Sequence, residues 1–288
     1  MSGDRLFRPV IRVRPGYVRA NGWPRSPVRR KPNESISAFV VKFPVRAVRW
    51  VVRFLTADIE ARRFRRINAL PSLVSPHPNA PIPPESARGV ERCDVRYINL
   101  DHRSDRREDF ENEVHVLGVS WHARHSATLA HPGALGCSLS HLQVLKDWEA
   151  TPGRLLLVCE DDAQFVASRS ELDTLIEEFA ASPDLQVLAL AYRTAWHIPI
   201  SDRLAVSADI QTTAAYVAKP EIVPDLVAAF EDSVHRLRQG QRDRLAALDQ
   251  VWKRVQRKRL FAIPRNKCVI QRAGFSDIQG ALTDYYGD

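Results

Sequence analysis

Apolar and polar positions follow two alternating patterns from residue 91 to residue 288. Short continuous apolar runs predict strands at residues 95–100, 155–159 and 187–191. Apolar residues three or four positions apart predict helices near residues 105–117, 135–148 and 170–181, with a further helix starting at Pro220. Because strands alternate with helices, we expect an α/β domain with a mostly parallel, Rossmann-like sheet flanked by helices.

Residues 1–90 follow neither pattern for most of their length. Residues 1–36 are rich in Arg and Pro without a helical or strand period, which predicts an irregular arm. From Val45 to Ile59, apolar residues fall on one helical stripe flanked by arginines, which predicts an amphipathic basic helix. Six prolines within residues 71–84 exclude a helix there. We therefore expect a basic extension with its helix (1–70), a proline-rich linker (71–90) and a folded domain (91–288).

The basic helix allows two interpretations. Its apolar stripe could enter the headgroup region of an anionic membrane while its arginines contact the lipid phosphates. Alternatively, it packs on the folded domain of the same chain, which is the interpretation we favour.

Charge is unevenly distributed along the chain. The net charge is +8, but residues 1–90 hold 18 Lys and Arg against 5 Asp and Glu, whereas residues 91–288 hold 24 against 29. A basic segment of this kind contacts an anionic membrane, a nucleic acid or an acidic partner, or is a solvated tail. Nucleic acid is the partner we favour least, although Trp23, Phe43 and Trp50 would offer stacking surfaces for bases.

Composition is that of an ordinary globular protein, with 44% hydrophobic and 26% charged residues. The N-terminus carries charge and proline where a secretory signal needs an apolar stretch, and charges interrupt residues 39–55, the most apolar run of the extension. We therefore expect a cytoplasmic protein, either free or peripheral on the inner face of the membrane. The four cysteines are far apart, form no C-x-x-C pair and have no nearby His at zinc spacing, so we expect four buried free thiols and no metal-ligating partner beside them.

Three consecutive carboxylates, Glu160, Asp161 and Asp162, follow the strand predicted at residues 155–159. Ligands bind outside the carboxyl ends of the strands in an open α/β sheet, which is where these acids fall. Three adjacent carboxylates repel one another unless a cation or hydrogen-bond donors offset the charge, and Mg²⁺ and Mn²⁺ prefer oxygen ligands. A Mg²⁺ or Mn²⁺ site is the specific hypothesis, and a helix cap or a solvated strand end is the alternative.

Two further segments carry candidate chemistry. The first predicted strand is followed by NLDHRSDRR, whose Asn and Asp can bond a base or ribose and whose arginines match phosphate oxygens. The segment GALGCSLSH lies at the start of the helix predicted near residues 135–148, and His141 falls on the apolar side of that helix. A histidine there is either a core residue with one hydrogen bond or a catalytic base.

In their order along the chain, NLDHRSDRR, GALGCSLSH, CEDD, TTAAYVA and QRAGFSDI resemble glycosyltransferase family 25, the lipopolysaccharide-biosynthesis and collagen galactosyltransferase group. The resemblance covers about residues 96–280. It implies a GT-A type, Rossmann-like fold, a glycosyltransferase catalytic domain over residues 91–288, and metal-dependent, inverting transfer of a galactose-like hexose. The donor would be a nucleotide sugar, usually UDP-linked, and the acceptor a glycan, a lipid-linked glycan or a protein.

The resemblance also implies roles for individual residues. Asp162, with Glu160, would bind Mn²⁺ or Mg²⁺. The donor pocket would be formed by Asn99, Asp101, Arg103, Arg106, Ser140, Glu160, Gln271 and Ser276. Candidates for the catalytic groups are Asp249, Asp161, Asp277 and His141, with the base sought among the three aspartates in that order. Asp249 borders the apolar stripe Leu245, Leu248, Trp252 and Val255, so it would project from the edge of a packed helix.

The sequence departs from the family pattern at His102, where an arginine is common, and after Tyr216, where the usual small-residue helix start is missing. The first departure could weaken a phosphate contact, and the second concerns the acceptor side. A different class of function also fits the chain: a nucleotide-sugar-binding or scaffold protein that has lost catalysis and docks through its basic extension.

Overall fold

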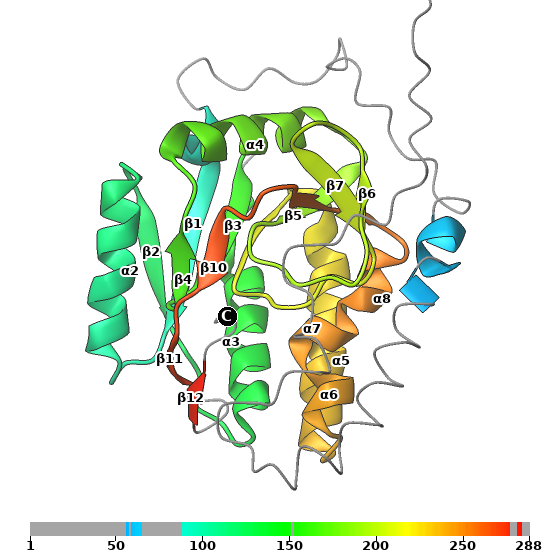
Figure 1. The fold of residues 1–288 in the computed structure, drawn as a ribbon. Coiled ribbons are helices and arrows are strands. Elements are labelled where there is room, and N and C mark those ends of the chain that lie inside the picture. Colours follow the sequence, from blue (N-terminus) through cyan, green and yellow to red (C-terminus); the bar gives the residue numbers. More distant parts are fainter. Residues whose placement is uncertain (1–55, 58, 65–87, 151–152, 277–280, 284–288) are drawn as a thin grey trace, which may run out of the picture.

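The computed structural model describes residues 56–57, 59–64, 88–150, 153–276 and 281–283. Its centre is an eight-stranded sheet in the order β2-β1-β3-β8-β5-β9-β7-β6 (Figure 1). In that order the strands are His122–Ser126, Cys93–Asn99, Leu155–Glu160, Ala215–Ala218, Leu185–Ala189, Leu260–Pro264, Leu204–Ser207 and Ile198–Pro199. The pairs β1–β2, β1–β3 and β5–β9 are parallel, whereas β8 and β7 are antiparallel to their neighbours. Six of the eight strands described here therefore run in one direction.

Helices cover both faces of this sheet (Figure 1). The helices of the described residues are α2 (Ser104–Val116), α3 (Gly133–Asp147), α4 (Arg169–Ala181), α5 (Val223–Arg238), α6 (Asp243–Ala246), α7 (Leu248–Val251) and α8 (Lys253–Gln256), with 3-10 turns η1 (Gly89–Arg92) and η2 (Pro220–Ile222). Phe110 of α2 and Phe179 of α4 are buried on one face, and Leu145 of α3 and Phe230 of α5 on the other. The predicted α/β class, with a mostly parallel, Rossmann-like sheet flanked by helices, is confirmed.

Two small antiparallel pairs complete the fold at the edge where β1 and β3 end. Strand β4 (Ala163–Phe165) pairs with β10 (Val269–Gln271), and β11 (Gly274–Ser276) pairs with β12 (Ala281–Thr283). The first pair brings the C-terminal segment beside the residues that follow β3. It therefore places Gln271 near the acidic triplet, 109 residues away from Asp162 in sequence.

The strands and helices predicted before residue 192 are each found within two residues of their predicted bounds. Strand β2 was not predicted, because His122–Ser126 is an edge strand of mostly polar residues without an apolar run. The predicted single helix around Asp249 is wrong, since three short helices, α6 to α8, occupy this segment. Leu245 of the predicted apolar stripe is 60% exposed, while Leu248, Trp252 and Val255 are buried.

The described end of the basic extension is helical and packs on the domain. Ala57 and Phe64 are buried in the same core as α4. The Phe64 ring lies 5.4 Å from the Trp196 ring, and the Trp196 indole donates to Glu60 over 3.2 Å. This agrees with the favoured interpretation for this part, although Ile59 of the predicted stripe is exposed. The predicted arm, most of the basic helix and residues 71–87 of the predicted linker lie outside the described residues. No described helix is long and apolar enough to cross a membrane.

Truncating Phe64 should destabilise the domain, because its buried ring packs against the Trp196 ring and its removal would leave a cavity there. We expect Phe64→Ala to lower the free energy of unfolding by about 3 kcal/mol, as measured by urea denaturation. The neighbouring Arg63→Ala, at an exposed position, is the matched control and should have little effect. Equal stabilities for the two variants would show that the extension does not contribute to the core.

Candidate active site

The acidic triplet lies at the carboxyl end of β3, beside the end of β1 in the sheet. The neighbouring strand β8 is antiparallel, so the residues that enter it, Thr212 to Ala214, lie at the same edge. The amide of Glu160 donates to the carbonyl of Ala214 over 2.7 Å. The site is therefore assembled from the ends of two parallel strands, the start of an antiparallel one and the C-terminal segment.

Asp162 is the member of the triplet with a buried carboxylate oxygen that accepts no hydrogen bond among the described residues. Its side chain is buried, and its Oδ1 atom has no hydrogen-bond partner among the described residues. Its Oδ2 atom accepts from Gln271 over 3.4 Å and lies 3.9 Å from the guanidinium of Arg106. Burial and the charge of Glu160 raise the pKa of Asp162 to about 8, although Arg106 opposes the shift. A buried carboxylate oxygen without a donor is a suitable ligand for Mg²⁺ or Mn²⁺.

Asp161 links the end of β1 to α2. Its Oδ1 accepts from Arg106 over 2.9 Å, and its Oδ2 accepts from Asn99 over 2.8 Å. Burial raises the pKa of Asp161, and Arg106 and Asn99 counteract it. Because this buried carboxylate joins the Arg106 guanidinium to the Asn99 amide, it suits a residue that positions these two groups better than it suits a base.

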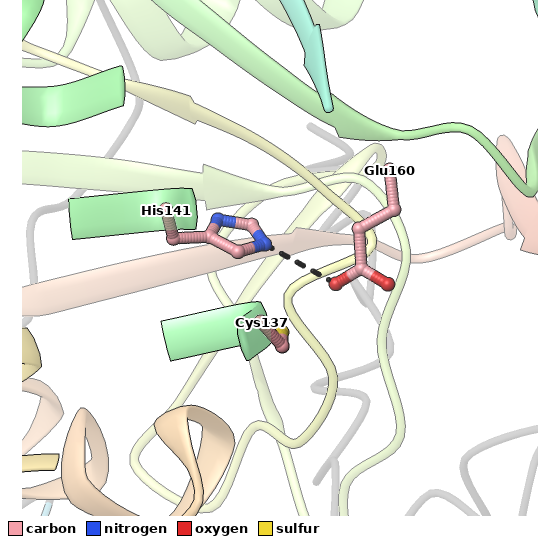
Figure 2. Close-up of side chains that lie close together, drawn as sticks. All are labelled: Cys137, His141 and Glu160. Carbon is pink, nitrogen blue, oxygen red and sulfur yellow. Dashed lines mark hydrogen bonds and ion pairs between the residues drawn. The ribbon is translucent and has the colours of Figure 1, made fainter. Parts of the chain in front are cut away.

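Glu160 faces α3, which carries His141 and Cys137. Its Oε1 accepts from Thr213 over 3.1 Å and lies 3.3 Å from His141 Nε2 (Figure 2). The other ring nitrogen of His141, Nδ1, lies 3.3 Å from the Tyr216 hydroxyl. Burial tends to raise the pKa of Glu160, but the contacts with His141 and Thr213 dominate and lower it. His141 is fully buried and contacts two polar groups, more than the single bond expected of a core histidine.

The donor-pocket residues predicted around the loop between β1 and α2 do not all face the acidic triplet. Asn99 contacts Asp161, and Arg106 reaches the acids, as described above. Asp101 is instead turned toward β2, where it accepts from Ser126 over 2.8 Å and pairs with Arg124, and these contacts lower its pKa. Arg103 pairs with Asp105 over 2.8 Å. Asn99 and Arg106 are therefore brought to the acidic triplet. The side chains of Asp101 and Arg103 instead pair with Arg124 and Asp105, although the Arg103 carbonyl accepts from the Asn99 side chain over 3.0 Å.

Ser140 has a structural role in α3. Its hydroxyl accepts from the amide of Thr128 and donates to the carbonyl of Gly136, each over 2.8 Å. These bonds attach the segment before α3 to the helix. The Ser140 hydroxyl thus donates its hydrogen to a backbone carbonyl and accepts from a backbone amide. This does not favour the contact with the nucleotide sugar that the family resemblance implies.

Gly136 is required by the same contact. A Cβ atom at this position would stand 2.4 Å from the carbonyl oxygen of Thr128, closer than side-chain carbons approach backbone. Gly136→Ala should therefore displace the segment and lower the free energy of unfolding by roughly 2 kcal/mol, measured by urea denaturation. Ser140→Ala, which removes the hydroxyl without adding bulk, should cost about 1 kcal/mol. A neutral Gly136→Ala would contradict the close approach.

The C-terminal residues complete the site. The Gln271 side chain lies between Asp162 and Thr212, whose hydroxyl donates to Gln271 Oε1 over 3.0 Å. Asp249 of α7 accepts from the Thr212 amide over 3.4 Å, so it belongs to the same network. Only the backbone of Ser276 is described, in β11, and Asp277 lies outside the described residues.

Several residues of this network were not assigned from sequence. Thr212, Thr213 and Tyr216 belong to TTAAYVA, which entered the family resemblance without roles. Thr212 has a φ of 71°, an unusual left-handed conformation for a β-branched residue and a form of strain found at functional sites. Arg124 donates from Nε to the Asn99 amide oxygen over 3.0 Å, and no signal marked it because β2 has no apolar pattern.

Cys137 also departs from the expectation of four buried thiols. All four cysteines are free, but Cys137 is partly exposed. It stands four residues before His141, one helical turn away, so the expectation of cysteines without a nearby metal-ligating partner is wrong for this residue.

No family model matches this chain, and neither does any curated protein. Among solved structures, it is similar to a glycosyltransferase involved in the glycosylation of the major capsid of PBCV-1. The two are 9% identical over 65% of this chain and 96% of the other, with a TM-score of 0.42. A likeness of this size establishes neither family nor activity.

Proposed function

We propose that this protein is a glycosyltransferase that transfers a hexose from a nucleotide sugar, UDP-linked, to a hydroxyl group. The observation that carries the proposal is the Asp162 carboxylate, buried at the carboxyl end of β3 with one oxygen lacking a donor. Its position agrees with the rule that ligands bind outside the carboxyl ends of strands in open α/β sheets. The ordered motifs that resemble glycosyltransferase family 25 support the same proposal from the sequence.

Asp162, with Glu160 nearby, would hold Mn²⁺ or Mg²⁺. A bound cation of this kind offsets the charge that grows on a departing diphosphate. Arg106 supplies a second positive charge at the same edge, and Asp161 holds its guanidinium in place over 2.9 Å. Asn99, which is the last residue of β1, is held by hydrogen bonds to Asp161 and Arg124. It would line the nucleotide pocket at this end of the strand.

An inverting reaction would form the bond between the acceptor oxygen and the anomeric carbon as the bond from that carbon to the diphosphate breaks. A carboxylate must take the hydroxyl proton. Asp249 is our first candidate, because it is partly exposed and connects through Thr212 and Gln271 to Asp162. Asp161 is less suited, since it is more deeply buried than Asp249 and the Arg106 guanidinium holds its Oδ1 over 2.9 Å.

A donor panel tests the proposal. Purified protein is incubated with UDP-sugars and Mn²⁺, with and without EDTA, while UDP release and donor binding are followed. We expect EDTA-sensitive release with one hexose donor, if only by slow hydrolysis in the absence of an acceptor. Absence of both release and binding across nucleotide sugars would contradict the proposal. Binding without release, even with candidate acceptors, would instead favour the protein that has lost catalysis.

A further inference from the structure

Cys137, His141 and Glu160 bring three different metal-ligating groups together (Figure 2). Their ligand atoms all lie within 4.8 Å of one another. Cys137 and His141 are four residues apart on α3 and so lie on the same face of that helix. Glu160 approaches from the end of β3, and the dashed contact in Figure 2 joins it to His141 over 3.3 Å.

The donor set indicates which cation would bind. Zinc takes thiolate, imidazole and carboxylate ligands, commonly three from the protein with a fourth position left open. Mg²⁺ instead requires oxygen ligands and binds thiolates poorly. The sulfur and nitrogen ligands at this position therefore distinguish it from Asp162, which offers only carboxylate oxygens.

The surroundings of the three residues also suit a zinc site. Zinc-ligating histidines commonly bond through the other ring nitrogen to a polar group that fixes the ring. His141 Nδ1 lies 3.3 Å from the buried Tyr216 hydroxyl, which leaves Nε2 directed at Glu160. Thr213 donates to Glu160 over 3.1 Å and so orients the carboxylate. Glu160 retains 19% side-chain exposure, and Cys137 is partly exposed, which provides a path for an ion.

We propose that Cys137, His141 and Glu160 bind a zinc ion at a site adjacent to Asp162. The site shares Glu160 with the proposed donor site. A zinc ion here would therefore occupy the Glu160 carboxylate, which could then no longer contribute to the Mn²⁺ or Mg²⁺ and nucleotide-sugar site. Zinc would consequently inhibit sugar transfer. The inhibition rests on the proposed function, whereas zinc binding itself does not.

Cobalt provides a spectroscopic test on the full chain, because a cobalt–thiolate bond has a charge-transfer absorption that oxygen and nitrogen ligands lack. We expect metal-free protein to bind one Co²⁺ with this band and to lose the band when Zn²⁺ is added. Cys137→Ser should abolish the band, and Glu160→Gln should weaken Co²⁺ binding by at least about tenfold. Cys93→Ala, which removes a buried thiol on the opposite face of the sheet, is the matched control and should retain it.

Asp162→Asn separates the two sites. It should retain the cobalt–thiolate band, because Asp162 is not among the three ligands. Thermal melting of each variant confirms that it is folded before its spectrum is interpreted. A wild-type protein without the band, or a folded Cys137→Ser variant that keeps it, would overturn the zinc site. None of these measurements uses a sugar donor, so their failure would leave the glycosyltransferase proposal unaffected.

Discussion

Asp162→Asn should reduce metal-dependent sugar transfer or donor hydrolysis by more than about 100-fold. The substitution keeps the size of the side chain and a carbonyl oxygen that can still accept from Gln271. It removes the negative charge and replaces one carboxylate oxygen with an amide nitrogen, which cannot ligate a hard cation. The expected defect is therefore in catalysis and cation binding and not in folding.

This experiment needs kcat/KM at saturating Mn²⁺ together with a melting temperature for each protein. Asp202→Asn is the control, because Asp202 is an exposed acid in the loop before β7. It should match the wild-type rate. A folded Asp162→Asn variant that turns over at the wild-type rate at saturating Mn²⁺ would remove Asp162 from the mechanism.

Cation-free protein should lose stability as the pH rises from about 4 to about 8. Burial and the charge of Glu160 raise the pKa of Asp162 from 3.8 to about 8, so the folded state holds a proton that the unfolded chain has released. A group of this kind contributes its full stability below the unfolded pKa. That contribution falls as the pH passes from 3.8 toward 8, because the unfolded state binds fewer protons over this interval. The expected loss is a few kcal/mol in the free energy of unfolding.

Two changes should cancel this loss. Asp162→Asn removes the ionising group, so the variant in EDTA should be more stable than the wild-type protein at pH 7. Saturating Mn²⁺ should stabilise the wild-type protein at the same pH, because a cation that binds only the folded state shifts the unfolding equilibrium.

Glu160→Gln should have the opposite effect from Asp162→Asn, because the pKa of Glu160 is lowered in the fold. Its ionised form is favoured in the folded protein, so Glu160→Gln should lower stability at neutral pH. Urea unfolding in EDTA at pH 5, 7 and 9 measures all three proteins. A flat profile for the wild-type protein would contradict the buried, ionisable state of Asp162.

The architecture was predictable from sequence because it depends on local patterns. The buried run at residues 155–159 could only be a strand or a short core segment, and the acids after it marked the strand's carboxyl end. The helices α2, α3 and α4 have apolar residues three or four positions apart, which predicted their positions. These features also placed Asp162 at the binding edge of the sheet.

The contacts inside the site were not predictable, because they join residues that are distant along the chain. One partner of Asn99 is Arg124, from a polar edge strand, and one partner of Asp162 is Gln271, from a small sheet near the C-terminus. Ser140 shows the converse: its motif suggested a donor contact, but its hydroxyl bonds backbone groups. The i, i+4 relation of Cys137 and His141 was visible in the sequence, whereas the approach of Glu160 required the fold.

The measurement that tests the central claim most directly is the binding of UDP to metal-free protein, titrated with and without Mn²⁺, for the wild-type chain and Asp162→Asn. We predict that Mn²⁺ strengthens UDP binding to the wild-type protein by at least about tenfold and has little effect on the variant. UDP binding that is equally tight without Mn²⁺ and in Asp162→Asn, or no UDP binding at all, would contradict a nucleotide-sugar site built around Asp162.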